Sequence, residues 1–217
     1  MIPTRPIRTP SRWRLAGGPL AWAAACLLAG CNLLPPPTTD PTRYFVLTGP
    51  ELAGGSSDTG IGSLRLGLKA VQVPEYLRGR AMVVRDGANE LALQDYARWA
   101  EPLQQGLTRV LKAQLLADHS VGRVDTAPLP FESERDYDVA IDIVQCEGAA
   151  EGARHVARFA AVIEIWTTGP QAHVVARRDF AAPEAAWNGT DYGRLAGELS
   201  QDAAALGREI LSALPPK

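Results

Sequence analysis

Cys31 is the residue of this chain best placed for a covalent reaction, because it directly follows the small-residue sequence Leu28-Ala29-Gly30. Small residues at this spacing are typical of the site at which an exported chain is cut. A thiol at the next position can receive diacylglycerol before the peptide bond is cut, whereas ordinary secretion signals need no cysteine there. The spacing therefore predicts cleavage after Gly30, which would leave Cys31 as the first residue.

The thirty residues before Cys31 have the three parts of a secretory signal in order. The first part carries no acid, and its basic residues are Arg5, Arg8, Arg12 and Arg14. A short apolar core follows over residues 20–28, and Ala29-Gly30 completes the signal. A permanent membrane-spanning helix needs about 20 apolar residues. Residues 1–30 are therefore predicted to be a transient export signal.

The sequence Leu28-Ala29-Gly30-Cys31 resembles the lipobox of bacterial lipoproteins, and the alternative is a chance cysteine after an ordinary cleavage site. The resemblance implies that Cys31 becomes the acylated first residue, with each buried CH₂ of its acyl chains contributing about 0.8 kcal/mol of membrane affinity. Lipoproteins retained in the inner membrane typically carry aspartate at the next position, where this chain has Asn32. By that sorting rule we expect the anchor to lie in the outer membrane of a Gram-negative bacterium, with the protein on the periplasmic face of that membrane.

The mature chain, residues 31–217, has the length of one domain of ordinary size. Loss of the four signal arginines leaves 18 basic against 24 acidic residues. This mildly acidic balance argues against a nucleic-acid partner, whose phosphates require a basic surface. Residues 31–42 contain Pro35-Pro36-Pro37 and Pro41 and are predicted to form an extended tether. Residues 43–217 are then a single domain.

The mature sequence is poor in groups that could perform catalysis. His119, His155 and His173 each lack a carboxylate or second histidine at metal-ligand spacing. Asp138 and Asp142 share a face of a predicted strand, at a separation more typical of solvated side chains than of a catalytic pair. Motifs for a serine nucleophile or a phosphate-binding loop are also missing. We therefore expect a protein that is not an enzyme and has no cofactor and no metal.

Cys146 is the cysteine left once Cys26 departs with the signal and Cys31 is acylated, so no intramolecular disulfide can form in the mature chain. It ends a strand-like run from Asp138 to Val144. We interpret it as a small buried hydrophobe. An intermolecular disulfide is the alternative.

Alternating and β-rich runs predict a series of strands separated by turn residues. The predicted strands cover residues 44–48, 64–73, 81–85, 90–94, 120–126, 137–144, 155–168 and 173–180. The sequence Asp86-Gly87 suits a hairpin turn. The segment 147–154 is predicted to be a loop that joins the two longest strands as an antiparallel pair.

Two amphipathic helices are predicted, one central and one terminal. The first begins at Glu101-Pro102, since proline suits the first helical turn, and its apolar face is Leu103, Leu107, Val110, Leu111 and Leu115. The second begins near Thr190 or Asp191, and its apolar face is Leu195, Leu199, Ala203, Leu206, Ile210 and Leu214. Together these elements predict an α+β fold, in which a largely antiparallel sheet is covered on one face by the two helices.

The segment from Arg98 to Leu103, Arg-Trp-Ala-Glu-Pro-Leu, stands out just before the first helix. We expect Trp99 to fill the core or to staple the first helical turn, and Arg98 and Glu101 to form a weak local ion pair. Together with Val73-Pro74-Glu75-Tyr76-Leu77 and the strand at Val83-Val84-Arg85, this segment resembles the signature of the ABC-type transport auxiliary lipoproteins, the PqiC-like family. The signature residues, interpreted as structural, are Pro74, Tyr76, Leu77, Arg98, Trp99, Glu101, Pro102 and Leu103.

The resemblance implies a periplasm-facing lipoprotein that works beside an inner-membrane permease and an MCE-domain protein. Such systems move phospholipid or other hydrophobic molecules between the two membranes. The family resemblance further implies docking of the MCE protein at the outer membrane and assembly into homo-oligomeric rings, and it identifies no contact residues. The alternatives are a pilotin or assembly scaffold of another envelope complex and, less favoured, a periplasmic hydrolase.

Overall fold

The computed structural model describes residues 39–50, 62–130 and 133–215. The predicted signal, Cys31 and most of the predicted tether lie outside the described residues, so the expectations for them stay predictions. Residues Pro41–Lys217 form one compact unit, and every described helix and strand belongs to it.

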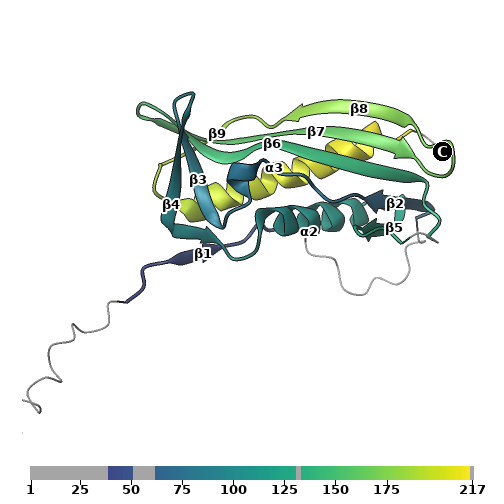
Figure 1. The fold of residues 1–217 in the computed structure, drawn as a ribbon, viewed down its shortest axis with the longest axis horizontal. Helices are drawn as coiled ribbons and strands as arrows, with labels where there is room; N and C mark the ends of the chain where they lie inside the picture. The colour runs from purple at the N-terminus through teal and green to yellow at the C-terminus, as the bar shows by residue number, and fades with distance from the viewer. Residues whose placement is uncertain (1–38, 51–61, 131–132, 216–217) are drawn as a thin grey trace, which may run out of the picture. The chain divides into compact units, whose positions relative to one another are not determined.

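The described residues form a nine-stranded sheet and two α-helices (Figure 1). In chain order the elements are β1 (Arg43–Phe45), β2 (Leu64–Leu68), the 3-10 helix η2 (Glu75–Leu77), β3 (Ala81–Asp86), β4 (Glu90–Trp99), α2 (Leu103–Leu116), β5 (Val121–Thr126), β6 (Tyr137–Glu151), β7 (Arg154–Thr167), β8 (Val174–Ala181), β9 (Ala185–Trp187) and α3 (Tyr192–Ala213).

The long antiparallel hairpin of β6 and β7 is the centre of the sheet. Strands β8 and β9 both pair antiparallel with β7, and β3 pairs antiparallel with β4. Parallel pairings add β2 and β3 to β6, β5 to β2, and β1 to β4. The predicted α+β class with a largely antiparallel sheet is confirmed, and short parallel strands extend that sheet at both ends.

Two strands are longer than predicted because each contains an irregularity that interrupts its alternation. The predicted strand 90–94 continues to Trp99, and the predicted strand 137–144 continues to Glu151. The register between β6 and β7 shifts after Ile143, and that between β3 and β4 shifts after Ala81. A bulge moves the following side chains to the opposite face, so the period-two pattern is lost although the strand continues. The predicted loop 147–154 is therefore mostly strand.

Other predicted strands are shorter than expected. The run 64–73 leaves the regular sheet after Leu68, although the amide N–H groups of Lys69 and Gln72 still donate to carbonyls of β6. Pro74 has no N–H to donate, and the chain turns there into η2. The first strand covers residues 43–45 rather than 44–48, because Leu47 turns into the core and the N–H of Thr48 donates to the hydroxyl of Ser200 on α3.

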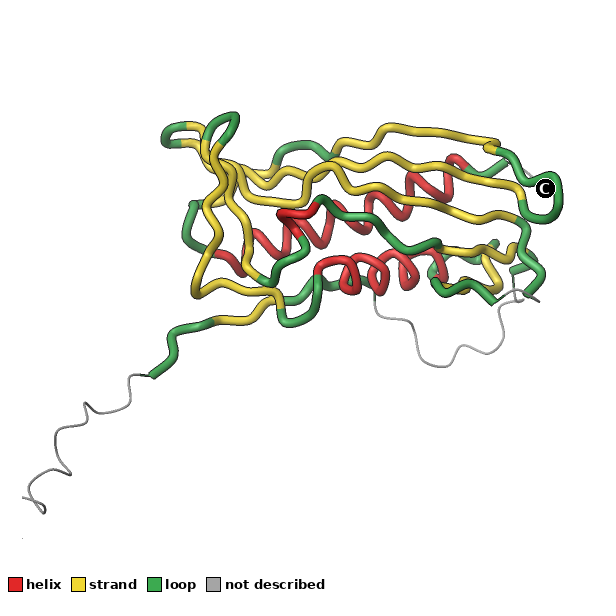
Figure 2. The backbone as a smooth tube through the Cα atoms, in the orientation of Figure 1, coloured by secondary structure: helices red, strands yellow, loops and turns green. Residues whose placement is uncertain are grey.

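The two helices pack against each other, and α3 also packs on β7 while α2 packs on β5. Figure 2 shows both helices running beside the long strands of the sheet. All five predicted apolar residues of α2 are buried, as are those of α3 except Leu214, which caps its C-terminal end and is half-buried. The side chain of Asp191 accepts a hydrogen bond from the N–H of Arg194 and caps the start of α3. Both predicted amphipathic faces are confirmed.

Candidate functional site

The first part of the family signature lies in a polar cluster beneath η2. Pro74 precedes η2 with φ −54°, and its carbonyl accepts from the N–H of Leu77, whose side chain enters the core. This turn places Tyr76 beside Arg85 of β3, whose Nη2 donates to the tyrosine hydroxyl over 3.4 Å. The guanidinium carbon of Arg85 lies 5.6 Å from the centre of the Tyr76 ring, within the range of a cation–π contact.

Arg85 also holds the buried carboxylate of Glu147 on β6. Its Nε lies 2.5 Å from Oε1 of Glu147, and the glutamate side chain has no exposed surface. The bond to Glu147 raises the pKa of Arg85, and burial together with Glu147 raises the pKa of Tyr76 to about 12. Oε2 of Glu147 has no hydrogen-bond partner among the described residues. The pair thus fastens β3 to β6, and loss of one partner would leave an uncompensated buried charge.

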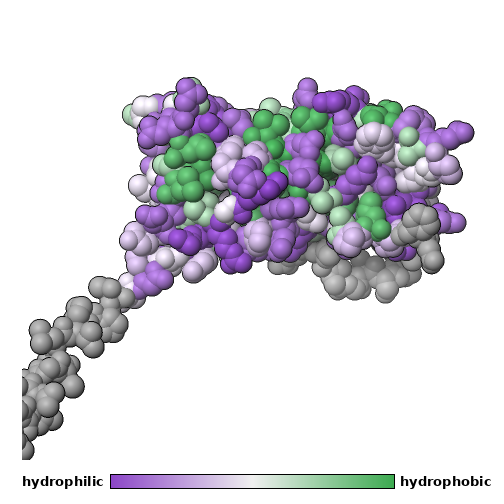
Figure 3. All heavy atoms as spheres, viewed as in Figure 1, coloured by the Kyte–Doolittle hydropathy of each residue, from purple (hydrophilic) through white to green (hydrophobic). Residues whose placement is uncertain are grey.

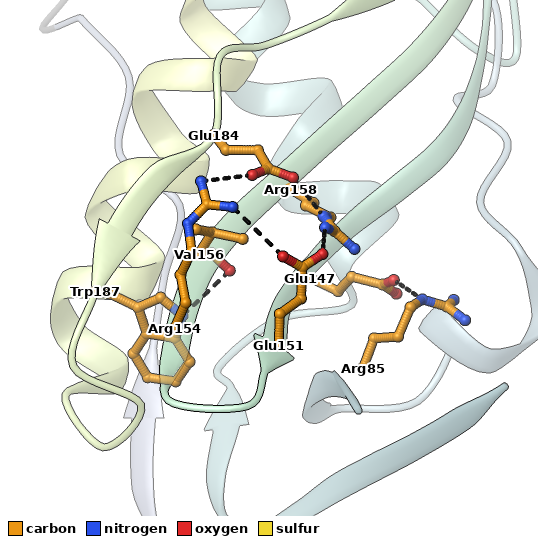
Figure 4. A network of polar contacts seen from close by, with 8 residues as sticks. All are labelled: Arg85, Glu147, Glu151, Arg154, Val156, Arg158, Glu184 and Trp187. Atoms are coloured by element: carbon orange, nitrogen blue, oxygen red, sulfur yellow. Dashed lines mark hydrogen bonds and ion pairs between the residues drawn. The ribbon is translucent and has the colours of Figure 1, made fainter. Parts of the chain in front are cut away.

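Four charged residues, of which Arg158 is half-buried and the others are exposed, form a second network at the closed end of the β6–β7 hairpin (Figure 4). Arg158 contacts Glu151 of β6 and lies 2.8 Å from Glu184, which precedes β9. Arg154 lies 2.9 Å from Glu184 and 3.4 Å from Glu151. The hydrogen bond from Arg158 lowers the pKa of Glu184. Because acids and arginines alternate and face solvent, the network ties β9 to the hairpin without offering a free reactive group.

The second part of the signature lies where β4 ends and α2 begins. Trp99 is the last residue of β4 and is buried in the core, so the core-filling interpretation is confirmed. The predicted Arg98–Glu101 ion pair is wrong. Alternation along β4 directs Arg98 to solvent while Trp99 faces the core, and Nε of Arg98 donates to the carbonyl of Asp95.

Glu101 is instead bound by Arg109, which lies further along the chain on α2. Nη2 of Arg109 lies 2.5 Å from Oε1 of Glu101 and also donates to the carbonyl of Leu47 over 2.8 Å. The Pro102 carbonyl accepts from the N–H groups of Gln105 and Gly106, which confirms a helix start at this proline. Arg109 thus joins Glu101 and the segment after β1 to the first turns of α2.

Arg80 connects the two parts of the signature. Its carbonyl accepts from the N–H of Trp99 over 2.7 Å, and its Nη1 donates to the carbonyl of Ala100 over 3.2 Å. Arg80, three residues after Leu77, therefore links the segment that follows η2 to the end of β4 and the residue after it. The contacts of Tyr76, Trp99 and Glu101 lie within the folded body, and the structural interpretation of the signature stays a prediction.

The remaining candidates lie apart from one another. Cys146 is buried, and burial raises the pKa of its thiol, so the predicted buried hydrophobe is confirmed and its sulfur cannot reach a second chain. Asp142 is exposed as predicted, but Asp138 is largely buried and lies 2.8 Å from Nε of Arg135. The solvated interpretation of Asp138 is wrong because the segment before β6 folds back over it.

The three histidines have different surroundings. His119 is exposed, and the ring of His155 meets the Trp187 ring edge-on at 5.9 Å. Nδ1 of His173 lies 3.1 Å from the hydroxyl of Thr167. Within the described ranges, no group of three or more histidine, cysteine and acidic side chains is arranged to hold a metal ion.

Asp202 is a buried acid that the sequence did not single out. It lies on α3 between Leu199 and Ala203, on the side of the helix that meets the core, and its Oδ2 has no hydrogen-bond partner among the described residues. Burial, with a smaller contribution from Glu198, raises its pKa to about 6. Its position within the apolar stripe was the available signal.

The surface of the described body has several hollows, of which one lies beside α2 and another beside β1. The first, of about 440 Å³, lies beside α2 and is lined by Lys69, Gln104, Thr108, Arg109 and Lys112 among others. The second, of about 330 Å³, lies between β1, β4 and the start of α3. Neither could be predicted, because each forms where residues distant in sequence meet. No helix in the described part of the chain is both long and apolar enough to cross a bilayer.

A mixed sheet with two packed helices and polar clusters that fasten its strands defines a compact α+β domain. The chain belongs to the family described as "ABC-type transport auxiliary lipoprotein component", whose sequence model matches residues 45–211. This family comprises transport auxiliary proteins and is not an enzyme family. The resemblance drawn from the signature residues is confirmed.

Solved structures show the same fold. The crystal structure of protein XCC0632 from Xanthomonas campestris, of the DUF330 family, is 19% identical with a TM-score of 0.65, over 78% of this chain and 93% of that one. An uncharacterized protein is 21% identical with a TM-score of 0.61, over 79% and 97% of the two chains. Among curated proteins, none matches this sequence.

Proposed function

We propose that this protein is a periplasmic lipoprotein anchored in the outer membrane through acylated Cys31. There it serves as an auxiliary subunit of an ABC/MCE-type intermembrane lipid transport system and docks the MCE-domain protein. The observation that carries this proposal is the family match over residues 45–211, which spans almost the whole folded body. The lipobox at Leu28–Cys31 and the following Asn32 support the anchor and its membrane.

The arrangement of charged groups supports a binding role. The buried acids and the buried thiol described above are either locked in an ion pair, as Glu147 is, or shut in the core, as Cys146 and Asp202 are. A general base or nucleophile must instead reach a substrate. A firm anchor and a rigid body suit a subunit that holds another protein at the membrane.

The partner is tested by capture of the lipidated protein from envelope extract through a tag after Lys217. We expect an MCE-domain protein and its permease to be recovered. Recovery of a secretin or another assembly platform in their place would favour the pilotin alternative and refute this proposal. Omission of the tag from the same strain controls for nonspecific capture.

The anchor is tested by mass spectrometry of the purified protein and by fractionation of the two membranes. We expect a chain that begins at Cys31 and carries acyl groups, found in the outer-membrane fraction. Asn32→Asp should shift it to the inner-membrane fraction, and Asn32→Gln is the matched control that should not. An outer-membrane location for the Asn32→Asp variant would contradict the sorting argument.

A further inference from the structure

Exposed apolar side chains gather at one end of the described body. Six large hydrophobic residues are exposed among the described residues, and four of them lie on or next to the paired strands β1 and β4. These four, which we term the tether-end surface, are Tyr44, Val46, Leu93 and Tyr96, with exposed fractions of 60%, 47%, 57% and 60%. Figure 3 shows apolar side chains over the end of the body where β3 and β4 lie. Single exposed hydrophobes are ordinary, but such a cluster marks an interaction surface.

The hollow of about 330 Å³ adjoins the part of this surface formed by β4, and Tyr44 and Val46 do not line it. Leu93 and Tyr96 line it together with the half-buried aromatic rings of Phe45 and Tyr192. Its charged lining residues are Arg43, whose guanidinium carbon lies 5.2 Å from the Phe45 ring centre, and Asp95. One cation and one acid leave no net charge, so burial of apolar and aromatic area must supply the affinity here.

The tether-end surface lies next to the predicted tether, and this position favours the membrane as its binding partner. Pro41 lines the hollow, and residues 32–40 connect it to Cys31. A fully extended chain spans at most about 3.6 Å per residue, so Pro41 stays within roughly 36 Å of Cys31. An acylated Cys31 would hold this end of the body at high effective concentration beside the bilayer. Tyrosine, with an apolar ring and a polar hydroxyl, is enriched at membrane interfaces.

We propose that the tether-end surface rests in the headgroup layer of the membrane, with the side chains of Leu93 and Tyr96 inserted among the lipids. This inference rests on the acylation of Cys31 in the proposed function. It gives the body an orientation. Helix α3 begins at Tyr192 in the hollow, and its 22 residues extend about 33 Å from it. The C-terminal end of α3 and the turn before β8 then face away from the bilayer (Figure 1).

Contact with lipid is tested on the full lipidated chain reconstituted in phosphatidylethanolamine vesicles with a minority of phosphatidylglycerol. Single cysteines are introduced as Leu93→Cys or Tyr96→Cys and labelled with a fluorophore. The matched control is Val174→Cys, an exposed apolar position on β8 at the other end of the body. Cys146 is buried and Cys31 is acylated, so the introduced thiol is the one that reacts.

The readout is quenching by phospholipids that carry a spin label in the headgroup region. Labels at positions 93 and 96 should lose about half their fluorescence or more, because they lie in the layer that holds the quencher, whereas the label at position 174 should keep it. Equal quenching at all three positions, or none at 93 and 96, would overturn the inference. This includes the case in which a second copy or a protein partner covers the surface and keeps lipid away.

A second measurement uses the chain from Pro41 onward, which contains every described element, in flotation with the same vesicles. Leu93→Ser should lower its vesicle partition coefficient roughly fivefold, since about half of a leucine side chain remains to be buried, and Val174→Ser should leave it unchanged. Equal effects of the two changes would contradict the proposed contact. The mass of the lipidated sample distinguishes a failure of this inference from a failure of the proposed anchor. An acylated Cys31 without quenching refutes this inference alone, whereas a bare Cys31 refutes the proposed anchor.

Discussion

Replacement of Asp202 by asparagine should stabilise the protein, and only above the pH at which the aspartate ionises. Asp202 is 9% exposed, lies in the apolar stripe of α3, and its Oδ2 has no hydrogen-bond partner among the described residues. Its pKa rises from an ordinary value near 3.8 to about 6 in the folded protein. The folded state therefore holds the proton more tightly than the unfolded state does.

The sign and size of the effect of Asp202 on the free energy of unfolding follow from proton linkage. Well below pH 3.8 the carboxyl is protonated in both states, and Asp202 imposes no ionic cost. As the pH rises toward 6, the unfolded chain ionises first, so the free energy of unfolding falls. Above that pH the loss is complete, and a pKa difference of about two units at 1.36 kcal/mol each amounts to about 3 kcal/mol. Asparagine keeps the shape and removes this loss.

The assay is urea unfolding of the Pro41–Lys217 body near pH 4 and near pH 7.5, with Asp142→Asn as the matched control for removal of an exposed carboxylate. Asp202→Asn should raise the unfolding free energy by about 2–3 kcal/mol at the higher pH and change it little at the lower pH. A gain of equal size at both pH values, or none at either, would refute the reasoning. The absence of a gain would show that the carboxylate is solvated or bonded in the folded state, and an equal gain at both pH values would show that the effect does not depend on ionisation.

Three further predictions concern the clusters described above. Arg85→Ala should lower the unfolding free energy by about 3–5 kcal/mol, because Glu147 would be left charged and buried, and Arg85→Ala with Glu147→Leu should recover most of it in the same urea titration. Trp99→Ala should lower the free energy of unfolding by about 3–5 kcal/mol, whereas Arg98→Ala, at the exposed neighbouring position, should lower it by less than about 0.5 kcal/mol. Equal losses would contradict the alternation along β4. Cys146→Ser should leave the folded state and the mass of any oligomer in light scattering unchanged, and loss of an oligomer would show that the buried thiol has an intermolecular role.

Local periodicity was enough to predict the helices. The spacing of Leu103, Leu107 and Leu111 is satisfied by one helix face, whatever that helix packs against, and all three are buried. The same holds for β7, where Phe159, Ala161, Ile163 and Ile165 share the buried face as predicted. Burial along β7 alternates without interruption from Phe159 to Ile165, so the period-two pattern of the sequence predicts which side chains face the core.

The rest of the structure depends on contacts between distant residues. The parallel pairing of β1 with β4 brings Phe45 beside Trp99, and no local pattern contains that register. The predicted Arg98–Glu101 ion pair is wrong because β4 continues five residues beyond its predicted end. Arg98 and Trp99 are therefore strand residues, and their side chains point to opposite faces of the sheet. The polar junction of Tyr76, Arg85 and Glu147 arises from three elements. A sequence motif can mark such residues but cannot say what each one touches.

The hydrogen bonds that follow β1 have a mechanical consequence. β1 pairs with β4 over three residues, whereas the next residues are held separately: Leu47 is buried, its carbonyl accepts from Arg109, and the N–H of Thr48 donates to Ser200. A force applied through the N-terminal segment would meet β1 first and could peel it from the sheet, releasing about 10 Å of slack. The hydrogen bonds at positions 47 and 48 would then stop further detachment of the chain before it reached the core. Detachment of β1 would thus lengthen the N-terminal segment under force before the rest of the folded body bears the load.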